Sequence, residues 1–279
     1  MPNPLLALHH RPTPLILPNA WDVASALIIQ DAGFEAIATT SAGVAWSLGY
    51  PDGEQISRDE MLAAVARIVR AVKLPVTADL EAAYGQRPDD AAETARDAVK
   101  AGALGFNFED TSDDPDHPLL PIPAQVERLR AARAAADALG VHLVINARTD
   151  VYLAAVGAPD TRFAETIRRL TAYRDAGADC LFAPGVADRD TIAALVREVA
   201  APLNVLATPA TPAVAELAQL GVARISIGGG VMRAALGVTR RRLADLTRDG
   251  RFDRLLEGAI SHGDMQELEK REGGHSKRN

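Results

Sequence analysis

The chain has 279 residues, enough to bury one large core without dividing into domains, because barrels of alternating strands and helices reach about 250 residues as one unit. Its composition, 48% hydrophobic and 24% charged, is that of an ordinary globular protein. A net charge of −7, with arginines scattered rather than clustered, argues against a nucleic-acid surface.

The sequence shows no targeting signal and little thiol chemistry. No apolar run reaches the roughly 20 residues of a membrane span. Met1–Leu17 has neither a basic start nor a small-residue cleavage site, so no export signal is predicted. Cys180 is the only cysteine, which excludes an internal disulfide and favours a reducing compartment. We therefore expect a cytoplasmic protein without a membrane partner.

A repeated pattern predicts the elements along the chain: a helix ends at a glycine and a short apolar run follows. Glycine just past a helix adopts the left-handed conformation that other residues resist, which turns the chain into a strand. Short apolar runs closed by polar residues are typical of strands buried on both faces of a parallel sheet. The pattern occurs as DAGFEAIATTSAG (31–43), KAGALGFNFED (100–110), DAGADCLFAPG (175–185) and LGVARISIGGG (220–230), and more loosely as ALGVHLVINARTD (138–150).

Eight strands are predicted, with amphipathic helices between them. One helix is predicted over 58–72, opened by a capping box of Ser57 and Glu60, and others over 90–100 and 124–139. Eight alternations favour a closed (β/α)₈ TIM barrel over an open doubly wound sheet, which would begin with a glycine-rich turn. The strands are predicted at 15–20, 36–41, 75–80, 105–109, 143–148, 180–184, 203–207 and 224–227.

The barrel is predicted to occupy residues 1–250 as a single domain. Beyond about Gly250 the pattern becomes polar, and 251–279 is predicted as a C-terminal helix followed by a disordered tail, GGHSKRN. No low-complexity linker or second domain is visible in the sequence.

Polar residues follow several predicted strands at the end where barrel active sites lie. The third strand ends in Asp79-Leu80-Glu81, and side-chain alternation places both carboxylates on one face. The fourth ends in Glu109-Asp110, of which alternation allows one to point inward. The fifth strand and the loop after the second add Asn146, Arg148 and Asp150, which point the same way, and Asp52.

Carboxylates that converge on one mouth repel each other unless a cation holds them. Oxygen-only ligation suits Mg²⁺ or Mn²⁺, with waters completing an octahedron. Zinc is disfavoured because the six histidines show no ligand spacing and the cysteine is near none of them. The sequence therefore predicts a hard-metal site at Asp79, Glu81 and Glu109, with Arg148 beside it; the alternative is a solvated rim of loop acids.

Several other residues have a chemical or a structural interpretation. Lys73 and Lys100 precede strands at the opposite face, which disfavours a Schiff-base aldolase. The glycines at 228–230 either offer amides to a phosphate or allow close packing. Cys180 is predicted to be a core residue. Two tryptophans either line a pocket or fill core, Trp21 and Trp46.

An ordered set of short motifs resembles the isocitrate lyase/phosphoenolpyruvate mutase superfamily. The resemblance covers roughly residues 15–230 and implies a barrel whose last helix is exchanged between subunits, which assembles homodimers or homotetramers. It also implies Mg²⁺ and a small 2-oxo acid, or its enol, as the bound molecule. The motifs are PNAWD (18–22), TTSAG (39–43), SLGYPDG (47–53), ADLEAAYG (78–85), FED (108–110) and ARTD (147–150).

The resemblance assigns roles by position. Asp79 matches the metal-binding aspartate, Glu109 matches the glutamate of the family's ED pair, and Glu81 stands where most members have a second aspartate. Asp52 resembles the aspartate after the second strand. Ser41, Ala42 and Gly43 match the segment that binds the substrate carboxylate in the family, and Arg148 matches the arginine that contacts the substrate oxygens. Trp21 is a candidate for the wall of the pocket.

The sequence departs from the family in the loop after the fourth strand. Isocitrate and methylisocitrate lyases carry K-x-C-G-H there, whereas this loop is TSDDPDHPLLPIP (111–123), with neither cysteine nor lysine. A phosphonate mutase would want lysine and asparagine in this lid, and both are missing. Pro184 replaces a glutamate common in the lyases, and LNVLAT (203–208) lacks the usual late asparagine.

Metal-assisted cleavage of a C–C bond remains the favoured chemistry. A 2-oxo acid chelates Mg²⁺ through its carboxylate and keto oxygens, and decarboxylation, as of oxaloacetate, needs little beyond stabilisation of the resulting enolate. A retro-aldol cleavage also needs a base, for which His117 and Tyr84 are candidates, and His117 is equally interpretable as a solvent-facing residue. The alternatives are an enzyme acting on a phosphonate or phosphate ester, and a non-catalytic protein that binds a 2-oxo acid such as 2-oxoglutarate.

Overall fold

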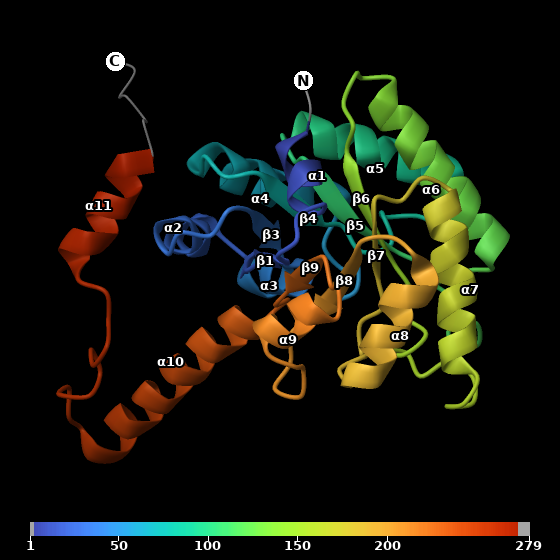
Figure 1. Cartoon of the computed structure of the whole chain (residues 1–279). Helices are drawn as coiled ribbons and strands as arrows, with labels where there is room; N and C mark the ends of the chain where they lie inside the picture. Colours follow the sequence, from blue (N-terminus) through green and yellow to red (C-terminus); the bar gives the residue numbers. More distant parts are fainter. Residues whose placement is uncertain (1–2, 273–279) are drawn as a thin grey trace.

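The computed structural model describes residues 3–272, in which short parallel strands form a nearly closed barrel (Figure 1). The strands are ordered β1-β9-β8-β7-β6-β5-β4-β3-β2. β1 (Leu15–Leu17) and β2 (Asn19–Ala20) are two halves of one strand, separated by Pro18, which has no N–H to donate. Because β1 pairs with β9 and β2 pairs with β3, this strand joins the two edges of the sheet. The tail, 273–279, lies outside the described residues.

The eight predicted strands are confirmed, each within two residues of its predicted ends. The first is divided at Pro18 for the reason given above, and the fourth has the predicted bounds. Besides β1 and β2, the strands are β3 (Ile37–Thr39), β4 (Val76–Asp79), β5 (Gly105–Glu109), β6 (Val144–Arg148), β7 (Cys180–Phe182), β8 (Leu203–Leu206) and β9 (Arg224–Ser226).

The three predicted helices are also present, with small differences at their ends. The Ser57 hydroxyl accepts the Glu60 N–H and donates to the Glu60 carboxylate, so half of the predicted capping box forms. Prolines at the first turn start the next two helices two residues earlier than predicted. The helices are α1 (Pro4–Leu8), α2 (Val23–Asp31), α3 (Ser41–Leu48), α4 (Arg58–Ala71), α5 (Pro88–Lys100), α6 (Ile122–Asp137), α7 (Arg162–Asp175), α8 (Arg189–Val199), α9 (Val214–Gln219), α10 (Gly230–Asp249) and α11 (His262–Glu272).

Side-chain alternation on β5 separates the core from the site. Phe106 and Phe108 are buried in the apolar layer that the strands form with the surrounding helices, and their rings stack 5.6 Å apart. Asn107 and Glu109, the alternate residues, project to the opposite face and contact polar side chains of β4 and β6. The outer face of the sheet therefore supplies the apolar core, and the inner face supplies the polar groups.

The C-terminal helices leave the barrel. α10 projects away from the strands as a long arm, and α11 lies back beside α2 (Figure 1). The arm and the segment after it expose large apolar side chains, including Leu236, Leu243, Phe252 and Leu256. No helix among the described residues combines the length and apolar character needed to cross a membrane.

Candidate functional site

Asp79 ends β4 with both carboxylate oxygens hydrogen-bonded. Oδ2 accepts the Ser41 N–H at 3.0 Å and the Ser41 hydroxyl at 2.8 Å, and Oδ1 accepts the Asn107 side-chain amide at 3.0 Å. The backbone N–H of Asp79 donates to the Thr39 hydroxyl. Asp79 is therefore held between the end of β3, the first turn of α3 and the barrel interior.

The first turn of α3 lies beside Asp79, and the Ser41 N–H points to its carboxylate. Thr40 caps the helix by accepting the Gly43 N–H at 3.4 Å. A Cβ at Gly43 would lie 2.6 Å from a Thr40 methyl and 2.9 Å from Trp21 Cβ, so only glycine fits this turn. Trp21 thus packs against Gly43 in the first turn of α3. Trp46, in α3 itself, is 40% exposed. A helix N-terminus suits a carboxylate.

Glu81 is a buried carboxylate with an unsatisfied oxygen. It is 4% exposed and adopts φ 50°, a left-handed conformation that turns its side chain back into the site. Oε2 accepts the Glu54 N–H at 2.8 Å, whereas Oε1 is buried without a hydrogen-bond partner. Burial, followed by the charges of Asp79 and Glu109, raises the pKa of Glu81 to about 8.

Glu109 and Arg148 form a buried ion pair across β5 and β6. Arg148 Nη1 lies 2.7 Å from Glu109 Oε2, and the rest of the guanidinium grips both oxygens of Asp150 at 2.5 and 2.6 Å. Thr111 donates to the other oxygen of Glu109. Burial raises the pKa of Glu109 even against the opposing charge of Arg148. Of the pair 109–110, Glu109 therefore faces the site.

Asp110 points away from the site and serves the fold. Its carboxylate accepts the Tyr173 hydroxyl at 2.6 Å and Arg169 at 2.9 Å, and it also accepts the Asp150 N–H. These contacts tie the end of β5 to α7. The acidic pair is thus divided between a site residue and a structural residue, as alternation on the strand predicts.

The donor set fits a hard cation, although the acids are not gathered as a finished cage. Among residues 3–272, no three acidic, histidine or cysteine side chains come together in a ready metal-binding arrangement. Even so, Asp79 and Glu109 both raise the pKa of Glu81, and Asp79 also raises that of Glu109. Mg²⁺ and Mn²⁺ prefer oxygen ligands. Either ion would relieve the repulsion between these carboxylates and would give a partner to the unpaired buried oxygen of Glu81.

The loop after β4 brings Tyr84 to the same mouth. The Tyr84 hydroxyl is buried without a partner, and burial followed by the charge of Glu81 raises its pKa. The Tyr84 N–H donates to Glu54 at 2.8 Å. Arg128 holds this turn by donating to the carbonyl oxygens of Ala82 and Gly85, and its guanidinium stacks on Phe108. Tyr84 is therefore positioned from two sides.

Asp52 and His117 differ in their exposure and in their interaction with the acidic side chains of the site. Asp52 is largely exposed on the loop after α3, and partial desolvation followed by the charge of Asp79 raises its pKa, so it lies within electrostatic reach of Asp79. The His117 side chain is 81% exposed and pairs with Asp114 at 2.9 Å, both on the lid. Asp52 is therefore close enough to feel the charge of Asp79, whereas His117 is exposed and paired within the lid.

A cavity of about 200 Å³ lies beside the acids. The lid, 111–123, closes on itself beside it, with Thr111 paired to Leu119 and the Ser112 N–H donating to Pro118. The cavity is lined by Gly53, Glu54, Glu81, Ala82, Glu109, Thr111, Ser112 and Asp113.

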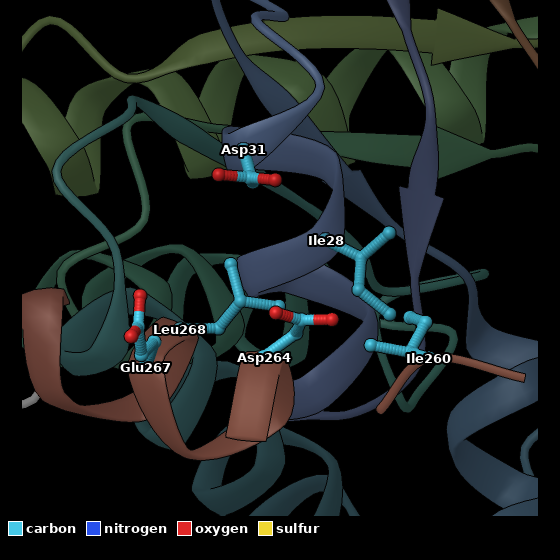
Figure 2. A pocket seen from close by; sticks show the side chains of 6 residues that line it. All are labelled: Ile28, Asp31, Ile260, Asp264, Glu267 and Leu268. Atoms are coloured by element: carbon cyan, nitrogen blue, oxygen red, sulfur yellow. The ribbon is translucent and has the colours of Figure 1, made fainter. Parts of the chain in front are cut away.

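Another cavity, between α2 and α11, is of a different kind. Figure 2 shows Ile28, Ile260 and Leu268 there with three acidic side chains. It lies against the C-terminal helix, on the outside of the barrel, and contains none of the predicted site residues.

The other sequence candidates have structural explanations. Cys180 is fully buried, and burial raises the pKa of its thiol to about 12, as expected of a core residue. The Asn19 side chain accepts the N–H groups of Ile227 and Gly228 at 2.9 and 2.7 Å. Those amides are engaged within the fold, and the glycine-rich turn joins β9 to the opening strand.

Sequence reasoning missed two residues that shape the site, Glu54 and Asn107. Glu54 lies in an irregular loop with φ 54°, and no pattern in the sequence indicates that its backbone would bind Glu81. Asn107 had a usable signal: it alternates with two phenylalanines on β5 and must therefore face inward beside Asp79.

The comparisons with known proteins define the family. The family model described as phosphoenolpyruvate phosphomutase matches residues 5–247. The chain therefore belongs to the phosphoenolpyruvate mutase/isocitrate lyase superfamily. Relatives in this superfamily include C–C lyases, oxaloacetate hydrolases and mutases.

Three proteins illustrate the range of relatives. A Burkholderia cenocepacia structure, assigned only broadly as a lyase or mutase, is 45% identical with a TM-score of 0.88, covering 94% of this chain and 93% of that one. Oxaloacetate decarboxylase 2 of Pseudomonas fluorescens is 30% identical over 75% of this chain and 70% of its own length. A structure of phosphonopyruvate hydrolase with oxalate and Mg²⁺ is 26% identical, with a TM-score of 0.85 and coverage of 96% and 94%.

Proposed function

We propose that the protein is a Mg²⁺-dependent lyase that cleaves a C–C bond in a small 2-oxo acid, as an oxaloacetate decarboxylase does. The observation that carries this proposal is that Asp79, Glu81 and Glu109 lie within electrostatic reach of one another at the carboxyl ends of β4 and β5, with Arg148 paired to Glu109 and Asp79 bound to the α3 N-terminus. The relatives that act on oxaloacetate or bind oxalate with Mg²⁺ support it.

Each residue has a role in this proposal. Asp79, Glu81 and Glu109 would hold the metal, Mg²⁺ or Mn²⁺, which when bound supplies Lewis-acid stabilisation of an enolate oxygen. The α3 segment, Ser41, Ala42 and Gly43, with Trp21 behind it, binds the substrate carboxylate. Arg148 binds the keto oxygen and stabilises its developing negative charge.

The bond cleavage itself requires little further machinery in a decarboxylation. The electron pair of the breaking bond moves into the 2-oxo group, carbon dioxide leaves, and a proton then reaches the former β-carbon. Tyr84 and Asp52 are the candidate proton donors or acceptors, and the buried, unpartnered hydroxyl of Tyr84 near the charge of Glu81 favours Tyr84. The exposed position of His117 gives it the weakest case as an acid or base.

The decisive experiment is the release of pyruvate from oxaloacetate with Mg²⁺, run beside an Asp79→Ala variant, because free metal also decarboxylates this acid. A wild-type rate at least tenfold above the variant would support a metal-dependent lyase centred on Asp79. Equal rates would remove oxaloacetate decarboxylation from the proposal.

Two alternative functions use the same site. A mutase or hydrolase acting on phosphonates is supported by the likeness to phosphonopyruvate hydrolase, and ³¹P spectra of phosphonopyruvate or phosphoenolpyruvate would reveal it. A non-catalytic protein that binds 2-oxoglutarate or a similar acid would show tight, metal-dependent binding without turnover.

We also propose that the protein forms homodimers or homotetramers by exchanging its C-terminal helices. The α10 arm projects from its own barrel and exposes Leu236 and Leu243. Exposed apolar side chains on a long unpacked helix are typical of a surface covered in an assembly.

A further inference from the structure

A buried arginine crosses the barrel interior beneath the site. Arg224, on β9, has no exposed surface, and its Nη2 donates to Asn107 Oδ1 at 3.1 Å. With β1 and β2 counted as one strand, β9 lies opposite β5 in the barrel, so the side chain spans the interior. Its Nε and Nη1 are buried without a hydrogen-bond partner, and Asp79 acts on it through its charge without a direct hydrogen bond. Burial lowers the pKa of Arg224.

A buried guanidinium that no carboxylate contacts directly is costly to a fold. The guanidinium contacts Asn107, the side chain that donates to Asp79 Oδ1. Asn107 Oδ1 accepts from Arg224 and from Asn146 Nδ2 at 2.7 Å, and Asn107 Nδ2 donates to Asp79 at 3.0 Å. Arginine can only donate, so it fixes which end of the Asn107 amide faces it.

We propose that Arg224 and Asn107 are positioning residues that orient the Asp79 carboxylate for metal and substrate, without contacting either. Arg224 sets the direction of the Asn107 amide, and that amide occupies Asp79 Oδ1 from below. Ser41 holds the other oxygen from above, so the carboxylate plane is fixed from two sides. The guanidinium also places a positive charge under the acidic cluster. This inference rests on the proposed role of Asp79 as a metal ligand.

The test compares Arg224→Met with wild type in two measurements. Binding of Mg²⁺ with oxalate is titrated by calorimetry, and the thermal unfolding of the metal-free protein is recorded. Methionine fills similar space without charge, so the metal-free variant should be as stable as wild type or more stable. Affinity for Mg²⁺ with oxalate should fall at least tenfold, because without Arg224 the Asn107 amide is free to turn and Asp79 loses the outer partner that orients it.

Arg133→Met is the matched control. Arg133 donates to the Leu143 and Gly177 carbonyls and pairs with Asp179, all before the first residues of β6 and β7 and thus at the opposite end of the barrel. This control should lose stability and keep its affinity, the reverse of the Arg224 variant.

The results distinguish a failure of the positioning role from a failure of the proposed function. Unchanged affinity in Arg224→Met would overturn the positioning role, and so would a loss of stability with affinity retained. If that variant does not fold, Asn107→Ser, whose hydroxyl is too short to reach Asp79, decides by the same tenfold criterion. Absence of Mg²⁺ and oxalate binding by the wild type would instead refute the proposed function and with it this role.

Discussion

Replacing Glu81 by glutamine should stabilise the metal-free protein at neutral and alkaline pH. The folded-state pKa of about 8 exceeds the ordinary value of 4.5, so the folded protein keeps a proton that the unfolded chain loses. As the pH rises from 4.5 to 8, folding is therefore penalised by about 1.4 kcal/mol per pH unit. The full difference between the two pKa values, 8 − 4.5, lowers the free energy of unfolding by about 5 kcal/mol above pH 8, and by about 3 kcal/mol at pH 7.

The measurement is urea unfolding of wild type and Glu81→Gln in EDTA at pH 5, 7 and 8.5. The variant should exceed the wild type by less than about 1 kcal/mol at pH 5 and by several kcal/mol at pH 8.5. Glutamine keeps an acceptor for the Glu54 N–H and offers N–H groups to the neighbouring acids. Glu127→Gln, an exposed change on α6, should match wild type at every pH. A difference between Glu81→Gln and wild type that does not grow with pH would refute the reasoning.

Three further predictions concern other parts of the molecule. His117→Ala should keep turnover within about twofold of wild type, whereas Tyr84→Phe should lower it at least tenfold if Tyr84 moves the proton; equal rates in steady-state assays would reject that role. Replacing both Leu236 and Leu243 by aspartate should convert the assembly into monomers, because charges on the exposed apolar face of α10 oppose its burial; light scattering measures the mass. A monomeric wild type would contradict helix exchange. Ser41→Ala should weaken Mg²⁺ binding about tenfold in calorimetry, because it removes the hydroxyl that donates to Asp79 and leaves only the backbone N–H on that oxygen; unchanged affinity would contradict a role of the hydroxyl in orienting Asp79.

The strands and the strand-end acids were predictable because each depends on local signals. Glycine after a helix marks where a strand begins, and alternation on a strand decides which of Glu109 and Asp110 faces the site. Those rules need only neighbouring residues, so one sequence suffices.

The contacts between distant segments were not predictable in the same way. Glu54 reaches Glu81 only because several residues adopt left-handed conformations in the loops after α3 and β4. Arg224 is 117 residues from Asn107, and its place in the interior depends on the closure of the barrel. An arginine at the start of a predicted strand gives no sign that it will be buried.

The hydrogen bonds of α3 divide the predicted carboxylate-binding segment into two functions. The Ser41 N–H and hydroxyl both bind Asp79, and the Gly43 N–H is directed to the Thr40 cap at the long distance of 3.4 Å. An incoming carboxylate would therefore rely first on the Ala42 and Gly43 amides, while Ser41 holds the metal ligand. If α3 binds the substrate as proposed, one helix turn serves both the substrate and Asp79, and a shift of α3 would alter metal and substrate binding together. Glycine at position 43, the only residue that fits against Trp21, keeps that turn in place.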